Sequence, residues 1–413
     1  MQRAEIVIVG AGIIGLSIAW QLARRGYRDV LVLEKAAGPG EGSTGASSAV
    51  CRYRYSAPPM IRLAKAGIES YRRWRVFTGC APPKAQFRNE GVLWFNGSDP
   101  AWAAAEHRRL QALGVRTTTL DGAALGEAFP ALNPCTGVVD LAQPDRHRCA
   151  QRPARHLLEL DGGYMDPVDA AADLLDACRG AGVTLRFNTR VSDVRVQSGA
   201  IDSVLTADGE ELASACLVNA AGPWCAPLYA ALGLDLPAPL SPMRIQMLHL
   251  NRTPALKGAI PVCVDKDNGI YFRTQNRGQQ LLVGSVREED ERETVADPDH
   301  YLGVADEPFR LEKLHLLQHR LPALSIDRSL RDYCGLYTCN LADVHPVIGA
   351  YGPKGFFVAN GFSGHGFKLA PAVGAMMARL ITGHRLPDED DQDDHWLAPG
   401  RAPIAVDSLS VLA

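Results

Sequence analysis

A chain of 413 residues is longer than one hydrophobic core usually organises, so we expect two domains or one large domain with an insertion. Apolar residues make up 46% and charged residues 22% of the chain, which excludes a disordered or membrane-embedded protein. The formal net charge is −3, with lysine and arginine dispersed, so small molecules are favoured as partners over nucleic acid or anionic lipid.

The cysteines and the apolar segments bear on the cellular compartment. The ten cysteines form no Cys-x-x-Cys pair, so we expect reduced thiols, no metal site and a cytoplasmic protein. Residues 6–18 are apolar but contain several glycines, which argues against a cleavable signal peptide. No run approaches the roughly 18 uninterrupted apolar residues of a membrane span, and we predict none.

Residues 1–40 predict a dinucleotide-binding βαβ unit. Residues 6–9 (Ile-Val-Ile-Val) are typical of a strand that is buried on both faces of a parallel sheet. From residue 14 the apolar positions follow helical spacing until Gly26, and residues 30–33 form the next predicted strand. The turn between strand and helix is GAGIIG, in which Gly10, Gly12 and Gly15 match G-x-G-x-x-G.

The three glycines and the following acid indicate how a dinucleotide would bind. The glycines permit the tight turn, the approach of a pyrophosphate to the backbone, and close packing of helix against strand. The amides at the start of the helix favour phosphate. Glu34 follows Gly15 by nineteen residues (34 minus 15), where it can bind the ribose hydroxyls and disfavour a 2′-phosphate. This fingerprint allows NAD or FAD, and the segment EGSTGASS at 41–48 favours a tightly bound flavin.

The rest of the chain continues the βα pattern around an interruption. We predict a helix at 168–181, strands at 183–187, 191–196, 201–205, 217–218 and 356–359, and a helix at about 369–380. Between residues 245 and 286, short alternating segments and the turn Asp267-Asn268-Gly269 predict an antiparallel hairpin. The acidic run DEDDQDD at 388–394 is expected to be a solvated surface or tail and not a metal site.

Four motifs carry a resemblance along nearly the whole chain. They are GAGIIG with Glu34, GSTGASSAVCRYRYS followed by MIRLA, DGGYMDP with NAAGPW, and GFSGHGFK. In these motifs the chain resembles the FAD-dependent amine oxidoreductases of the D-amino-acid oxidase, sarcosine oxidase, glycine oxidase and dimethylglycine dehydrogenase type. The resemblance implies an α/β fold, in which a Rossmann-like FAD-binding domain is interleaved with an α+β substrate domain on an antiparallel sheet.

The expected domains are discontinuous in sequence. We assign residues 1–85, 150–240 and 325–390 to the FAD-binding domain, and residues 86–149 and 241–324 to the substrate domain. Residues 391–413 are expected to form a C-terminal tail.

The resemblance also implies site residues. GFSGHGFK is similar to the segment that, in the sarcosine oxidase branch, wraps the flavin pyrimidine edge and supplies a substrate-facing lysine, here Lys368. Arg52 or Arg54 would be the matching arginine, and Tyr271 is expected to wall the pocket. The backbone amide of His365 is expected to face a flavin carbonyl. The expected FAD-binding residues are Gly10, Gly12, Ile14, Gly15, Glu34, Lys35, Gly42, Ser43, Thr44, Ser47, Val191, Ala220, Gly222, Gly361, Ser363, Gly364, His365, Gly366 and Lys368.

The implied reaction is oxidation of the C–N bond of an amino acid or N-substituted amino acid. Arg52 and Lys368 would hold the substrate carboxylate and fix the α-carbon near the flavin N5, which accepts a hydride; the imine product then hydrolyses. An apolar pocket would lower the amine pKa by desolvation, so no dedicated base is required.

Two features depart from the pattern of the sarcosine oxidase branch. Simple oxidases carry a lysine beside the flavin that is thought to promote reaction with oxygen, whereas the corresponding strand here reads Leu281-Leu282-Val283-Gly284-Ser285, and Lys266 precedes the turn. Oxygen and another electron acceptor are therefore equal alternatives. Covalent attachment in that branch uses a cysteine two residues before Tyr-Thr, whereas Cys334 is displaced by one position, so we expect non-covalent FAD.

Two other functions remain open at this stage. A flavin-dependent 2-hydroxy-acid dehydrogenase would use the same cations for its carboxylate. A flavin-binding assembly or scaffold protein is the alternative from another class, because complex I assembly factors also resemble this family at the C-terminal glycine loop. Some relatives need additional subunits, so further subunits are possible partners.

Overall fold

A computed structural model describes residues 2–143, 146–149, 155–389 and 393–412, which form four sheets. The six-stranded sheet has the order β19-β20-β13-β2-β3-β9. Its strands are β2 (Ile6–Val9), β3 (Val30–Leu33), β9 (Thr184–Arg186), β13 (Cys216–Asn219), β19 (Val347–Ala350) and β20 (Phe356–Asn360). The predicted strands at 6–9, 30–33, 183–187, 217–218 and 356–359 are thereby confirmed.

The direction of these strands positions the GAGIIG turn. All neighbouring pairs in the sheet are parallel except β19 with β20. The carboxyl ends of β2, β3 and β13 therefore meet at one edge of the sheet, where an open α/β sheet binds its ligand. This edge brings together Gly10, Glu34 and Ala220, which directly follow the three strands.

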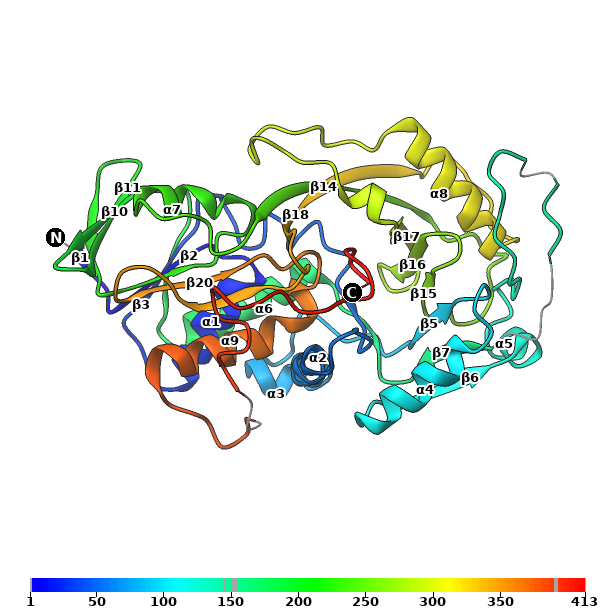
Figure 1. The fold of residues 1–413 in the computed structure, drawn as a ribbon, viewed down its shortest axis with the longest axis horizontal. Helices are drawn as coiled ribbons and strands as arrows, with labels where there is room; N and C mark the ends of the chain where they lie inside the picture. Colours follow the sequence, from blue (N-terminus) through cyan, green and yellow to red (C-terminus); the bar gives the residue numbers. More distant parts are fainter. Residues whose placement is uncertain (1, 144–145, 150–154, 390–392, 413) are drawn as a thin grey trace.

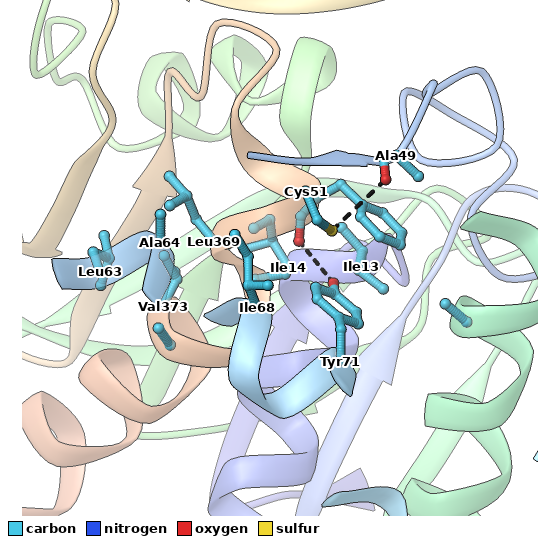
Figure 2. Packing of buried hydrophobic residues seen from close by; sticks show 14 of the residues in the cluster. Ile13, Ile14, Ala49, Cys51, Leu63, Ala64, Ile68, Tyr71, Leu369 and Val373 are labelled. Carbon is cyan, nitrogen blue, oxygen red and sulfur yellow. Dashed lines mark hydrogen bonds between the residues drawn. The ribbon is translucent and has the colours of Figure 1, made fainter. Parts of the chain in front are cut away.

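Helices pack around this sheet through two separate apolar clusters. The helices are α1 (Ile13–Arg24), α2 (Pro58–Arg72), α3 (Trp74–Thr78), α6 (Pro167–Gly180), α7 (Ala226–Ala231) and α9 (Gly366–Thr382). Figure 2 shows apolar side chains of α1, α2 and α9 meeting, among them Ile14, Ile68 and Leu369. The Tyr71 hydroxyl of α2 donates to the carbonyl of Phe367 at 2.7 Å, which fastens the start of α9.

The eight-stranded sheet has the order β18-β14-β17-β16-β15-β5-β7-β6. Its strands are β5 (Val92–Phe95), β6 (Thr117–Leu120), β7 (His156–Glu159), β14 (Leu240–Asn251), β15 (Val262–Asp265), β16 (Ile270–Gln275), β17 (Gln280–Ser285) and β18 (Arg331–Asn340). Asp265 pairs with Ile270 across the predicted turn, so the hairpin is confirmed. The long strands β14 and β18 arch between the two halves of the molecule (Figure 1).

Further helices surround the eight-stranded sheet. They are α4 (Trp102–Ala112), α5 (Gly122–Ala128) and α8 (Glu307–Arg320), with the 3-10 turns η2 (Gly222–Trp224) and η3 (Glu288–Glu291) elsewhere in the chain. No helix among the described residues is both long and apolar enough to cross a membrane.

Two small sheets complete the fold. One has the order β1-β12-β11-β10 and comprises β1 (Gln2–Arg3), β10 (Val191–Gln197), β11 (Ala200–Thr206) and β12 (Glu211–Ala213). The other pairs β4 (Val50–Cys51) with β8 (Gly163–Tyr164).

β7 and β18 fall in sequence ranges expected for the FAD-binding domain but lie in the eight-stranded sheet. The domain boundaries near residues 150 and 325 stay predictions.

The C-terminal residues do not form a solvated tail throughout. Glu389 accepts ion pairs from Arg25 and Arg379, and Asp394 pairs with Arg379 at 2.5 Å. The expectation of a solvated acidic run is therefore wrong for these two acids, because arginines of α1 and α9 face them; residues 390–392 lie outside the described part. Leu397 is fully buried in the core, and the chain then ends between the two halves (Figure 1).

Candidate active site

A cavity of about 540 Å³ opens at the carboxyl edge of the six-stranded sheet. Several segments from different parts of the chain form its walls. They are the GAGIIG turn, the residues around Glu34, residues 40–47, 189–191, 220–224, 298–301 and 334–338, and the loop before α9. We call it the larger cavity.

The turn at the base of the larger cavity requires glycine at two positions. Gly10 has φ of +108°, and a Cβ there would lie 2.5 Å from the carbonyl oxygen of Ala220. A Cβ on Gly15 would lie 1.9 Å from the carbonyl oxygen of Gly10, so only glycine lets α1 approach β2 this closely. The Thr44 hydroxyl accepts the N–H of Ile13 at 3.0 Å, which ties the start of α1 to the 40–47 loop.

Glu34 lies on the wall of the same cavity at the end of β3. Its carboxylate oxygens accept the backbone N–H groups of Ala11 and Ala36, both at 2.8 Å. These bonds fix the carboxylate beside the turn, and its remaining lone pairs are available to hydroxyl donors.

A charged cluster closes the far end of the larger cavity. Asp299 accepts from the Lys35 ammonium, from Arg190 at 2.9 Å and from the Trp224 indole at 2.7 Å. Lys35 also lies 3.8 Å from the centroid of the Trp224 ring. The Lys35 ammonium, followed by Arg190 and Trp224, lowers the pKa of Asp299 to about 2. The cluster joins the segment before α8 to the end of β3.

A second, smaller cavity of about 40 Å³ adjoins the larger one. The two share Ser47, Tyr337, Gly364 and Phe367 as lining residues, so they are separated by side chains and not by a sheet. The smaller cavity is largely apolar, and Lys368 points its charge into it.

Lys368 is 3% exposed and lies at the start of α9. Within the described part of the chain, no residue hydrogen-bonds to its Nζ, which lies 5.7 Å from the centroid of the Tyr55 ring. Burial, followed by the nearby Arg52, lowers the pKa of this ammonium well below its ordinary value. A buried ammonium without a partner is unfavourable, and an anion in the smaller cavity would relieve it.

The two arginines that precede α2 are already engaged. The Arg52 guanidinium donates to the carbonyls of Arg54 and Val411. Arg54 donates to the carbonyl of Leu412 at 2.7 Å and to Asp407 at 3.2 Å. The role of Arg52 or Arg54 in substrate binding stays a prediction, because both guanidiniums are hydrogen-bonded in this conformation. Of the three expected cations, only Lys368 lacks a hydrogen bond among the described residues.

A buried carboxylate holds the backbone of this arginine segment. Glu159 of β7 accepts the N–H groups of Tyr53 at 2.6 Å and Arg54 at 3.1 Å, and the Trp94 indole at 2.9 Å. Burial raises the pKa of Glu159, although these three donors oppose the shift.

Residues 407–412, which we call the tail segment, form one wall of the smaller cavity through Val411 and Leu412. Besides the arginine contacts, Glu291 accepts the N–H of Val411 at 2.9 Å and Glu288 accepts that of Leu409 at 3.0 Å. The tail segment is thus held from both sides.

A family model described as FAD dependent oxidoreductase matches residues 5–380. The chain belongs to this family. It is 27% identical to FAD-dependent oxidoreductase domain-containing protein 1 of Xenopus laevis over 422 residues, which cover 92% of this chain and 79% of that protein. It is 25% identical to human mitochondrial dimethylglycine dehydrogenase over 92% of this chain, but spans only 42% of that protein.

Solved structures with this fold cover almost the whole chain. L-proline dehydrogenase from P. horikoshii matches with a TM-score of 0.80 and 24% identity, over 96% of this chain and 97% of that one. Glycine oxidase from Bacillus cereus matches with a TM-score of 0.76 and 18% identity, over 97% of this chain and 100% of that one. These likenesses establish the fold expected from the sequence.

The larger cavity fits the FAD of this family. Its glycine turn offers backbone to a pyrophosphate, and Glu34 offers a carboxylate to the ribose hydroxyls. Most residues expected to bind FAD line it, namely Gly10, Gly12, Ile14, Glu34, Lys35, Gly42, Ser43, Thr44, Ser47, Val191, Ala220, Gly222, Ser363, Gly364 and Gly366. Gly15 and Gly361 serve close packing outside the lining, and Lys368 lines only the smaller cavity.

His365 does not have the position expected from the motif. Its backbone N–H donates to the carbonyl of Phe362 at 2.7 Å, so it is already used within the loop. Its ring is fully buried against Tyr55 and His345, with no hydrogen bond to either nitrogen from the described residues. Burial lowers the pKa of the imidazole, which is a packed neutral side chain.

Sequence reasoning missed three contributors to the two cavities. Tyr337 lines both of them, Asp299 closes the far end of the larger one, and the tail segment closes the smaller one. In the sequence, the Tyr337-Thr338 pair served only to locate the cysteine that could attach the flavin covalently. The other two carry no local motif. Tyr271 lines the smaller cavity, and its hydroxyl donates to Met247 Sδ at 3.4 Å; its role as a wall of the substrate pocket stays a prediction.

Cys334 lies on the wall of the larger cavity. Its side chain, however, is on one face of β18, and Gly335 is on the other face. A Cβ on Gly335 would lie 2.5 Å from Ala46 Cβ, so that position faces the 40–47 loop. Cys334 therefore faces the Arg244 side. Burial raises the pKa of its thiol, which disfavours the nucleophilic thiolate.

Proposed function

We propose that this FAD-dependent oxidoreductase oxidises the C–N bond of an amino acid or N-substituted amino acid whose carboxylate is bound by Lys368. The observation that carries the proposal is a buried ammonium without a hydrogen bond, in a small apolar cavity that shares its walls with the FAD cavity. A substrate carboxylate would balance the charge of the Lys368 ammonium and orient the α-carbon toward the wall shared with the FAD cavity.

The chain's own residues would prepare the amine. Val50, Val264, Val286 and Phe367 surround the cavity with apolar surface and exclude water. Such surroundings favour the neutral amine, whose lone pair is needed when the α-hydrogen leaves. Bound FAD supplies the acceptor for that hydride, and the imine product hydrolyses in water.

FAD would be held without a covalent bond. The turn at Gly10–Gly12 and the start of α1 would bind the pyrophosphate, Glu34 the ribose, and the cluster around Asp299 would cover the far end. The position of Cys334 on the other face of its strand, and its raised thiol pKa, support this assignment.

The tail segment must shift before substrate binds. A volume of about 40 Å³ has room for roughly three waters, less than the smallest amino acid needs. Withdrawal of Val411 and Leu412 would enlarge the cavity and release the Arg52 guanidinium. Arg52 could then join Lys368 on the carboxylate, as the sequence motif suggests.

The electron acceptor is proposed to be other than oxygen. Lys368 is the one lysine that lines the smaller cavity among the described residues, and β17 contributes none. If Lys368 binds the carboxylate, no second lysine of the described residues lines the smaller cavity to promote the reaction with oxygen. Admission of air after anaerobic reduction tests this point, since rapid reoxidation would contradict it.

The function is tested by an anaerobic screen of D-, L- and N-methyl amino acids with the FAD-loaded protein. Loss of the oxidised flavin absorbance with one class, together with release of ammonia or free amine, is the expected result. Bleaching by 2-hydroxy acids alone would identify a hydroxy-acid dehydrogenase, because Lys368 would bind that carboxylate equally well. No bleaching by any compound would favour a flavin-binding scaffold protein.

A further inference from the structure

Four metal-ligating side chains meet outside both cavities. They are Cys135, His147, Cys149 and His319, and one ligand atom from each lies within 4.8 Å of all the others. They come from three segments, which are the loop after α5, residues 146–149, and the last turn of α8. Two sulfur and two imidazole nitrogen atoms form the ligand set preferred by Zn²⁺ in structural sites.

The spacing of these atoms suits a tetrahedral ion. Bond lengths of about 2.3 Å to sulfur and 2.0 Å to nitrogen place neighbouring ligand atoms about 3.3–3.8 Å apart. Cys135 Sγ lies 3.4 Å from His147 Nε2. The rings of His147 and His319 stand edge to face, with centroids 4.7 Å apart, so their nitrogens can point at one ion without stacking.

Backbone and side-chain donors contact the sulfur atoms of both cysteines. The N–H of Gly137 donates to Cys135 Sγ at 3.4 Å, and the Asn133 amide donates to Cys149 Sγ at 3.5 Å. Such contacts around a metal ligand orient it toward the ion. His319 Nε2 is buried and has no hydrogen-bond partner among the described residues. A buried nitrogen of this kind is costly unless a ligand binds it.

Two of the four ligands, Cys135 and His319, are held in place by the hydrogen bonds of Arg320. Arg320, next to His319, donates to the carbonyls of Asn133 at 2.8 Å and Cys135 at 2.7 Å. Its guanidinium also pairs with Asp265 of β15 at 2.7 Å, and both side chains are 1% exposed. Cys135 and His319 are thus fixed relative to the eight-stranded sheet, whereas His147 and Cys149 belong to the segment that an ion would fasten to them.

We propose that these four residues bind one structural Zn²⁺ that joins residues 146–149 to α8 and the eight-stranded sheet. Four protein ligands leave no open position for substrate, so the ion has no place in the flavin reaction. Binding converts the two thiols to thiolates and releases their two protons, with no change of oxidation state. Spacing alone did not indicate this site, because the ligands are Cys-x11-His-x-Cys with a histidine far along the chain.

The test is metal analysis of the FAD-loaded protein after gel filtration. We expect roughly one zinc per chain in the wild type. Cys135→Ser, Cys149→Ser and His319→Ala should each remove most of it while the flavin absorbance per chain is unchanged, since none of these residues lines the FAD cavity. His315→Ala, one turn earlier on α8 and outside the cluster, should retain the ion.

Cobalt provides a second measurement that does not depend on the variants. Reconstitution of the metal-free holoprotein with Co²⁺ should give the visible bands of a tetrahedral thiolate site, at longer wavelength than the oxidised flavin. The proposal is overturned if the wild type binds neither metal, if zinc stays bound in both Cys149→Ser and His319→Ala, or if mass spectrometry finds Cys135 and Cys149 joined as a disulfide in the freshly purified protein.

Discussion

Lys368, Arg52 and Arg54 are three buried cations that differ in their hydrogen bonds. All three are nearly fully buried, yet the guanidiniums are bound by backbone carbonyls while the Lys368 ammonium faces a cavity. A guanidinium has five donors in a rigid fork, so it can bind the tail segment and its own backbone together. The lysine is the side chain left for a ligand.

The depressed pKa of Lys368 predicts a pH dependence of carboxylate binding. As pH rises through that pKa, which burial places well below the ordinary lysine value, the ammonium is lost and the affinity for an anion falls. Propionate, which has no amine to titrate, can be followed by its effect on the flavin spectrum. Its Kd should rise with pH in the wild type and become nearly constant in Lys368→Met.

Arg52, Cys51 and Glu159 also influence the charge of Lys368. Burial raises the pKa of the Cys51 thiol to about 12, so it stays neutral throughout this titration. An identical pH profile in Lys368→Met would assign the effect to one of the other groups and contradict the prediction.

The Cys334 position makes a separate prediction about the cofactor. If the thiol lies on the strand face opposite to Gly335, denaturation with acid should release all of the flavin into the supernatant, and Cys334→Ser should bind as much FAD as the wild type. Flavin that remains with the precipitated protein would show a covalent bond and refute the assignment.

At the scale of elements, the tail segment forms one wall of the smaller cavity, and we expect it to control access. Leu412 is 8% exposed and lines that cavity, whereas Leu409 is 47% exposed and does not. Leu412→Gly removes buried apolar contacts that hold the segment in place, which should ease its withdrawal and lower the KM for substrate several-fold, roughly as loss of about 1 kcal/mol of packing would.

Leu409→Gly is the matched control, because it makes the same change three residues before Leu412, at an exposed side chain that does not line the cavity. It should leave the KM unchanged. Equal kinetics of the two variants would mean that the tail segment does not compete with substrate.

At the scale of the whole molecule, the Asp299 cluster ties the substrate side to the FAD cavity. Because Lys35 and Arg190 hold the pKa of Asp299 near 2, its charge is lost only in strong acid, and the cluster is insensitive to pH in the usual range. Exposed ion pairs are screened by salt. Asp299→Asn should raise the Kd of FAD about fivefold and reduce its salt dependence.

Asp297→Asn is the control for this variant, since Asp297 is exposed, forms its ion pair with His300, and accepts the N–H of Asp299 at 2.9 Å through an oxygen that asparagine keeps. It should bind FAD like the wild type. Unchanged FAD affinity in Asp299→Asn would show that the cluster does not cover the bound cofactor.

The parts of the fold that follow a local sequence pattern could be predicted. The parts that depend on packing between distant segments could not. The GAGIIG turn and Glu34 obey local rules of strand, turn and helix, and Lys368 was found through its glycine-rich motif. Asp299, the tail segment and the Cys135 cluster depend on contacts between residues far apart in sequence, and no local pattern marks them. The place of β18 in the eight-stranded sheet could not be predicted either, because a strand carries no local sign of its partner.

The central claim is that Lys368 selects substrates by their carboxylate. The most direct measurement compares the rate of anaerobic flavin reduction by an amino acid substrate with that by its decarboxylated amine, in the wild type and in Lys368→Met. A charge-assisted hydrogen bond predicts that the wild type favours the carboxylate about 10- to 150-fold and that the variant loses this preference. An equal preference in both proteins would contradict the account.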